Sequence, residues 1–303
     1  MKLGLVSAIL PDLTFEEVID YAAGVGFECI EVCCWPKGKA ERRYAGVTHI
    51  DLDALDSGKM TYYRDYSEKR GVSISSLGFY PNALDPDEKA AAAAVEHIRK
   101  LIHVSSEMGI GMVTTFTGRN KNKGVEENLE LFKKTWVPIV ELAGEKNVKI
   151  GIENCPMLYT ANEWPGGNNL ASSPAIWREM FSIIPNRNFG LNYDPSHLYL
   201  TGGSETKPLY EFKERIFHVH FKDIKIYQEK LDDYGYFSLP ALWHSPKIPG
   251  MGGVDFGKFC SSLNEIGFSG PACIEVEDRA FEGNLLKVKQ GIEQSYRYMR
   301  QFI

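Results

Sequence analysis

Carboxylate and imidazole side chains stand at the ends of four short apolar runs in the second half of the sequence. These runs read GIEN, NYD, HVHFKD and CIEVED. Their ligand-type residues are Glu153, Asp194, His218, His220, Glu275 and Glu277. Residues two positions apart share one face of a strand, so either histidine and either of the last two glutamates could join the first two acids. Three carboxylates brought together would repel one another, and a bound cation would remove that conflict.

Each of these residues also has a purely structural interpretation when taken alone. Glu153 could pair with a lysine or an arginine. His218 and His220 could be buried histidines that bond to the backbone. Four successive runs that each place such a residue at the same end favour a shared site over four independent structural roles.

The elements that must position these residues form a regular alternation. The apolar runs, predicted as strands, are 2–10, 29–35, 72–80, 111–118, 148–154, 188–194, 215–224 and 271–278. The amphipathic runs, predicted as helices, are 14–27, 53–71, 85–109, 125–147, 173–184, 207–215, 254–268 and 284–303. This alternation predicts an α/β fold, a (β/α)8 TIM barrel whose active site lies at the C-terminal strand ends. The alternative, an open doubly wound sheet, needs a glycine-rich phosphate turn after its first strand, where this chain has SAILPDLT.

The composition indicates a globular protein without a nucleic-acid or membrane partner. The chain is 44% hydrophobic and 24% charged and has no linker, so we expect residues 1–303 to form a single domain. Its net charge of −6 repels phosphate backbones. No apolar stretch reaches transmembrane length, the N-terminus lacks a secretory layout, and the six cysteines are scattered. We therefore expect a cytoplasmic protein with reduced thiols.

The motifs GIEN, NYDPSH, HVHFKD, IPGMGGVDF and IEVED, in this order on predicted strands five to eight, resemble a known superfamily. It is the sugar isomerase/epimerase superfamily of xylose-isomerase-like TIM barrels, which includes ketose 3-epimerases and inosose dehydratases. The resemblance spans essentially the whole chain. It implies one divalent metal ion, bound by Glu153, Asp194, His220 and Glu275, with Glu277 as the alternative to Glu275.

The resemblance also implies the chemistry of the site. Its oxygen-rich ligand set favours Mn²⁺, with Mg²⁺, Co²⁺ or Zn²⁺ as alternatives. The metal would polarise the carbonyl of a keto-sugar, and Glu153 and Glu275 would remove and return a proton through an enediolate. We therefore expect a metal-dependent sugar isomerase or epimerase. The alternative within the enzymes is a lyase that performs β-elimination on an inosose or a 3-keto-glycoside. Ketose 3-epimerases of the family carry an arginine six residues after the metal histidine, and Ile226 occupies that position here.

Two long aromatic segments, 154–171 and 227–253, indicate where the substrate binds. We expect Trp164, Trp243 and His244 to cover a sugar ring, with packing against the barrel rim or a second subunit as the alternative. We expect Glu31 to point near the pocket, and Lys222 and Asp223 to bind a hydroxyl or each other. His197 resembles the family's substrate-contacting histidine. Few cations lie in the last loops, so an unphosphorylated sugar or keto-sugar is favoured. Relatives of this kind are commonly homodimers or homotetramers.

Two rival functions use the same barrel. An apurinic endonuclease of the endonuclease IV type needs extra histidines for three zinc ions, and the corresponding stretches FYPN, FTGR and IPGMGG contain none. A non-catalytic sugar-binding protein would not need every metal ligand, so the complete ligand set disfavours it.

Overall fold

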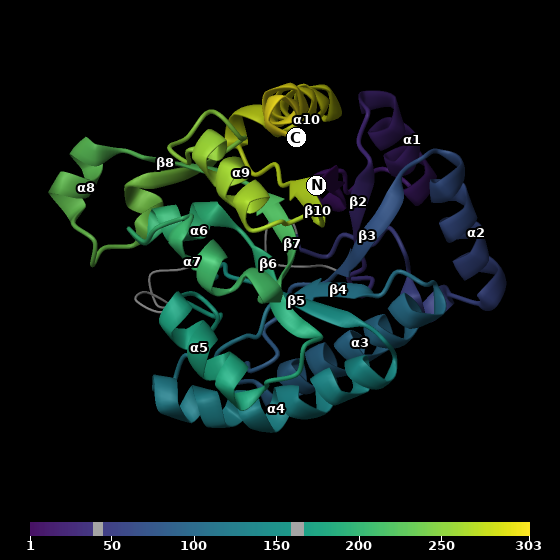
Figure 1. The fold of residues 1–303 in the computed structure, drawn as a ribbon, viewed down its shortest axis with the longest axis horizontal. Coiled ribbons are helices and arrows are strands. Elements are labelled where there is room, and N and C mark those ends of the chain that lie inside the picture. The colour runs from purple at the N-terminus through teal and green to yellow at the C-terminus, as the bar shows by residue number, and fades with distance from the viewer. Residues whose placement is uncertain (39–44, 159–166) are drawn as a thin grey trace.

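The computed structural model describes residues 1–38, 45–158 and 167–303, which form a closed barrel of parallel strands (Figure 1). The barrel strands are β1 Lys2–Val6, β2 Cys29–Cys33, β3 Ser73–Gly78, β4 Met112–Thr115, β5 Lys149–Glu153, β6 Phe189–Tyr193, β7 Ile216–Phe221 and β10 Pro271–Ile274. Their order around the barrel is β1-β10-β7-β6-β5-β4-β3-β2. Pairing of β1 with β10 closes the ring, which confirms the predicted (β/α)8 barrel and excludes the open sheet.

The helices lie outside the barrel and connect its strands (Figure 1). The helices of the barrel layer are α1 Phe15–Val25, α2 Ser57–Lys69, α3 Glu88–Glu107, α4 Val125–Glu145, α5 Pro174–Ile183, α6 Pro195–Leu200, α7 Lys207–Glu211, α9 Phe256–Glu265 and α10 Leu285–Met299. Side-chain caps start several of them. Thr14 and Glu17 form a capping box at α1, and Asp87 accepts two backbone N–H bonds at α3.

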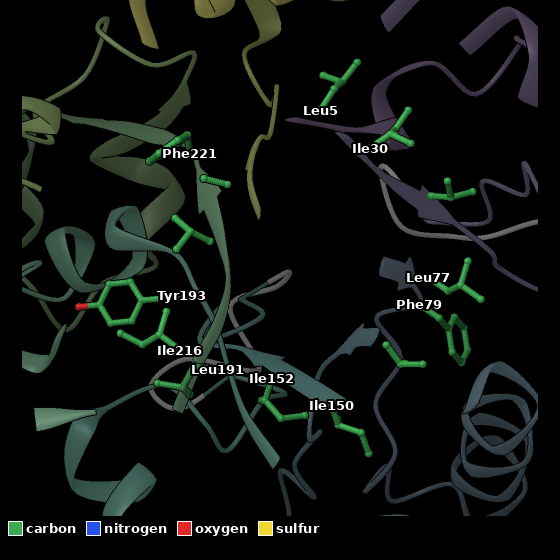
Figure 2. Packing of buried hydrophobic residues seen from close by; sticks show 14 of the residues in the cluster. Leu5, Ile30, Leu77, Phe79, Ile150, Ile152, Leu191, Tyr193, Ile216 and Phe221 are labelled. Atoms are coloured by element: carbon green, nitrogen blue, oxygen red, sulfur yellow. The ribbon is translucent and has the colours of Figure 1, made fainter. Parts of the chain in front are cut away.

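Apolar side chains of the strands point outward and fill the space under the helices. Figure 2 shows this layer at Ile150 and Ile152 of β5 and at Leu191 and Tyr193 of β6. All four side chains are fully buried. Along each strand they alternate with residues that face inward. Glu153 lies on the other face of β5, so its side chain points into the barrel.

The segment after β7 departs from the sequence prediction, which treated residues 227–253 as a loop. Strand β8 (Asp223–Ile226) pairs in an antiparallel manner with β9 (His244–Lys247), and α8 (Gln228–Tyr234) lies between them. We call residues 223–247 the arm, which projects from the barrel at the left of Figure 1. A buried cluster of Leu200, Ile224, Leu231 and Trp243 supports it. The prediction was wrong because this pairing depends on contacts between distant residues, which local periodicity does not reveal.

Candidate active site at the C-terminal strand ends

Four ligand-type residues meet where β5, β6, β7 and β10 end. Glu153, Asp194, His220 and Glu275 each offer one donor atom, and these atoms lie within 4.8 Å of one another. The first three are at most 3% exposed. Glu153 is the last residue of β5, and Asp194 and Glu275 directly follow β6 and β10. The strand register of the closed barrel therefore brings together residues that are up to 122 positions apart in the sequence.

Two asparagines hold the strand ends that carry the acids. Asn154 pairs with the backbone of Asp194: its Oδ1 accepts from the Asp194 N–H at 2.8 Å, and its Nδ2 donates to the Asp194 carbonyl at 2.9 Å. Asn169 donates to the carbonyl oxygens of Glu153 and Cys155, at 2.9 and 2.7 Å. Sequence reasoning missed both roles. The GIEN motif offered a signal for Asn154, because it follows Glu153 directly.

Lys222 lies among the carboxylates. Its Nζ is 2.8 Å from Glu275 Oε2, 3.3 Å from Asp194 Oδ2, 3.4 Å from Glu277 Oε2 and 3.9 Å from Glu153 Oε1. The Lys222 side chain is 4% exposed. These carboxylates hold its pKa well above the usual value, although burial alone would lower it. A positive charge in this position offsets part of the repulsion among the acids.

The two carboxylates expected to exchange protons differ electrostatically. Burial raises the pKa of Glu275 to about 7, with Lys222 opposing the shift and neighbouring carboxylates adding to it. Burial acts in the same direction on Glu153, but His197, His220 and Lys222 together hold its pKa well below the usual range. Two carboxyl groups with separated proton affinities are suited to acid and base roles at one pH.

The donor set fits a divalent cation. Asp194 Oδ2 and Glu275 Oε2 are buried, and among the described residues neither has an aligned hydrogen-bond partner, although both lie within ion-pair distance of Lys222. Buried carboxylate oxygens with unused acceptor capacity are costly unless a cation takes it up. Three carboxylates and one imidazole are a hard, oxygen-rich set of the kind that Mn²⁺ and Mg²⁺ prefer.

His197 lies beside the same acids. It belongs to α6, which begins at Pro195 with Asp194 as its cap. His197 Nε2 is 3.3 Å from Glu153 Oε1 and 3.2 Å from Asp194 Oδ2. The helical step of three residues between Asp194 and His197 places both side chains on one side of the helix start.

A cleft of about 570 Å³ reaches two of the four candidate ligands, Glu153 and Glu275. His197, Lys222 and His244 line it, together with Glu153 and Glu275. Aromatic and apolar residues form another part of its wall: Trp35, Tyr80, Phe116, Met157 and Leu158. A cleft of this size with a few convergent polar groups is suited to a small-molecule ligand.

Two residues expected at the pocket, Trp243 and Glu31, do not line the cleft. A third, Trp164, lies outside the described residues. Trp243 is 1% exposed and packs inside the arm. Glu31 is fully buried inside the barrel and does not line the cleft. Instead, its carboxylate lies 3.0 Å from His220 Nε2.

Asp223, expected to bind a hydroxyl or Lys222, instead fastens the IPGMGG segment to the arm. Its carboxylate accepts backbone N–H bonds from Ile224, Gly250, Gly252 and Val254 at 2.8 to 3.0 Å. The loop after β9 is thereby fixed to the start of β8. The sequence signal for this role was the glycine-rich loop itself, whose backbone N–H groups can converge on one carboxylate.

Comparison with known proteins places the chain in a family. Residues 19–302 match the model of the family described as xylose isomerase-like TIM barrel, and the chain belongs to that family. It is 25% identical to the inosose dehydratase of Geobacillus thermodenitrificans over 94% of this chain and 90% of that protein.

Solved structures show the same fold. The structure of D-psicose 3-epimerase in the presence of D-fructose matches with a TM-score of 0.70 at 14% identity, covering 100% of this chain and 99% of the other. The structure of IOLI protein with a binding zinc atom matches with a TM-score of 0.71 at 17% identity, covering 100% and 96%. The proteins similar to this chain thus include a dehydratase by sequence and an epimerase by fold. Among the described helices, none has the length and apolar character needed to cross a membrane.

Proposed function

We propose that this protein is a divalent-metal-dependent enzyme that moves a proton at a carbon next to the carbonyl of a keto-sugar or keto-cyclitol. The observation that carries the proposal is the meeting of Glu153, Asp194, His220 and Glu275 under a cleft of small-molecule size. These four residues would hold one cation, with Mn²⁺ favoured by the hard oxygen donors. When bound, the cation would polarise the substrate carbonyl and so acidify the neighbouring C–H bond.

Glu153 and Glu275 are the proposed acid–base pair. They extend from β5 and β10, which are not neighbours in the barrel, so they approach a ligand in the cleft from different directions. One carboxylate removes the proton from carbon, and the other delivers a proton to the product. His197, Lys222 and His244 line the cleft and offer N–H groups to the hydroxyls of the ligand.

Isomerisation or epimerisation is the proposed outcome, in which the proton returns to a carbon atom. Elimination is the second candidate, because a sequence relative over most of the chain is an inosose dehydratase. In elimination the same base removes the carbon-bound proton, and the hydroxyl on the next carbon leaves as water after an acid protonates it. Ile226 in place of the epimerase arginine is compatible with this second outcome.

Deuterium exchange tests the proposed function. The Mn²⁺-loaded protein is incubated in D₂O with a panel of ketoses, an inosose and 3-keto-glucosides. The metal and protein are then removed, and the sugars are followed by NMR. We expect deuterium at a carbon next to the carbonyl, and the product distinguishes an epimer or isomer from an eliminated sugar. If no panel member exchanges although Mn²⁺ and sugar both bind, the protein is a non-catalytic sugar-binding protein.

A matched pair of variants tests the assignment of Glu275. Glu275 and Glu277 both reach Lys222, at 2.8 and 3.4 Å, but only Glu275 belongs to the group of four donors. We expect Glu275→Gln to abolish both exchange and tight Mn²⁺ binding. Glu277→Gln should retain Mn²⁺ binding. The reverse result would transfer the metal-ligand role to Glu277.

A further inference from the structure

A buried polar network lies inside the barrel, below the cleft, with Glu31 of β2 at its centre. Glu31 is 0% exposed. One of its carboxylate oxygens, Oε1, accepts from the hydroxyl of Tyr80. The other, Oε2, accepts from Ser76 Oγ at 3.2 Å and lies 3.0 Å from His220 Nε2. A buried carboxylate with this many partners is fixed in position, because each partner restricts its rotation.

The backbone leaves room for the carboxylate. Gly78 ends β3, and a Cβ atom at that position would lie 2.7 Å from Glu31 Oε1. A larger residue would therefore displace the Glu31 side chain. Ser76 and Gly78 belong to β3, and Tyr80 stands two residues after its end, so β3 and the residues that follow it both accommodate Glu31 and bond to it.

The two ring nitrogens of His220 face different surroundings. Nδ1 is directed toward the candidate metal site, 3.7 Å from both Glu153 Oε1 and Glu275 Oε2. Nε2 is directed into the barrel, toward Glu31. A carboxylate can only accept, so a hydrogen bond to Glu31 requires the proton on Nε2, and the lone pair of neutral His220 then lies on Nδ1.

We propose that Glu31 is a positioning residue that holds His220 with Nε2 protonated and the Nδ1 lone pair directed at the metal. This inference rests on the metal site of the proposed function. Carboxylates that bond to the outer nitrogen of a metal-ligating histidine fix both the ring orientation and the tautomer. Glu31 thereby acts on the metal through His220 and touches neither metal nor substrate.

One neighbour allows the opposite arrangement. Asn192 Nδ2 lies 3.0 Å from His220 Nε2, and an amide N–H donated to that nitrogen would place the proton on Nδ1. Asn192 Nδ2 carries two hydrogens and also donates one to the Tyr80 hydroxyl at 3.2 Å, which leaves the other within reach of His220. The charged carboxylate makes the stronger hydrogen bond, so the Glu31 partner determines the tautomer.

The test measures metal affinity and the tautomer directly. Mn²⁺ affinity of wild type and Glu31→Gln is measured by competition with a chelator, with the unfolding midpoint of each metal-free protein recorded alongside. We expect Glu31→Gln to bind Mn²⁺ roughly 10- to 100-fold more weakly. Tyr80→Phe removes one hydrogen-bond donor to Glu31 but leaves the contact between Glu31 and His220 in place. This variant should therefore lose less Mn²⁺ affinity than Glu31→Gln.

Ser75→Ala is the matched control. Ser75 Oγ lies 3.1 Å from Nε2 of His218, another buried histidine of the barrel interior. This variant also removes a partner from a buried imidazole, but not from His220. We expect Mn²⁺ affinity within about twofold of wild type, because the hydrogen bonds of Ser75 run to His218 and Cys273 and to none of the four metal ligands. His218 itself remains in place, 3.8 Å from Glu31 Oε2. An equal loss in Ser75→Ala and Glu31→Gln would reduce the role of Glu31 to general stability and overturn the inference.

NMR of protein labelled with ¹⁵N-histidine and loaded with Zn²⁺, which is diamagnetic, reports the tautomer of His220, assigned with His220→Gln. We expect a proton on Nε2 in wild type and a changed Nε2 resonance in Glu31→Gln. A proton on Nδ1 in the loaded wild type, or wild-type affinity in Glu31→Gln, would refute the positioning role. If Asp194→Ala still abolishes metal binding in that case, the proposed metal site stands without this inference.

Discussion

Replacement of Lys222 by methionine removes an ammonium group that lies between 2.8 and 3.9 Å from four carboxylates. Methionine retains most of the side-chain volume, so the change is mainly one of charge. Removing one partner of a buried ion pair destabilises a protein by about 3–5 kcal/mol, because the other partner is left buried and uncompensated. We expect a loss of this size in the metal-free protein.

The corresponding shift in melting temperature follows from the size of the chain. Unfolding entropies near about 2.1 cal/mol/K per residue give roughly 0.6 kcal/mol/K for 303 residues. A loss of about 3–5 kcal/mol therefore lowers Tm by about 5–8 °C. Thermal unfolding of the chelator-treated protein, followed by circular dichroism, measures this shift. Saturating Mn²⁺ should reduce the deficit, because the cation supplies the positive charge that the variant lacks.

Lys100→Met provides the matched control. Lys100 Nζ lies 2.8 Å from Asp53 Oδ1, the same separation as the Lys222–Glu275 pair, but the two side chains are 44% and 68% exposed. Water screens an exposed pair, so the Tm of this variant should equal that of the wild type. Equal melting temperatures for metal-free wild type and Lys222→Met would show that Lys222 does not neutralise the buried acids, and our account of the site would fail.

Two further predictions concern the fold around the site. Gly252→Ala should lower stability by about 1–3 kcal/mol in chemical denaturation, because overpacking at this position is severe: the new Cβ would lie 2.2 Å from Asp223 Oδ1. Gly24→Ala in α1 is the control, because its new Cβ meets no atom within 4 Å, and it should raise stability by about 0.5–1 kcal/mol. Equal changes in unfolding free energy for the two variants would show that no clash occurs at Gly252. Burial lowers the pKa of His97, so protonation favours the unfolded chain, and the unfolding free energy should fall as the pH drops below about 6.5. His97→Gln should flatten that part of the pH–stability curve, and an unchanged slope would show that His97 does not contribute to it.

The alternation of apolar and amphipathic runs was sufficient to predict the barrel. The predicted strand 148–154 contains β5, Lys149–Glu153, and the predicted helix 125–147 contains α4, Val125–Glu145. Periodicity is a local property, and buried parallel strands show it strongly. The arm was missed because β8 and β9 are short, and their pairing, Asp223↔Lys247, joins residues on either side of α8.

The sequence by itself determined which residue types stand at the strand ends, because spacing along a strand decides the face on which a side chain lies. It therefore nominated Glu153, Asp194 and the pair His218/His220 as candidates for the barrel interior. Spacing alone left both histidines open, and only the family resemblance favoured His220. The tertiary structure brings His220 together with Glu153, Asp194 and Glu275, whereas His218 Nδ1 lies 3.0 Å from Asn192 Oδ1, inside the barrel.

The position of Glu31 also required the tertiary structure. From the sequence, an acid in the second strand could face either the cleft or the interior. Its depth in the barrel depends on the stagger between neighbouring strands, which shifts at Ile30 and Glu31 where β2 pairs with β3. That stagger is a property of the closed sheet, set by how eight strands pack together, and no local pattern encodes it.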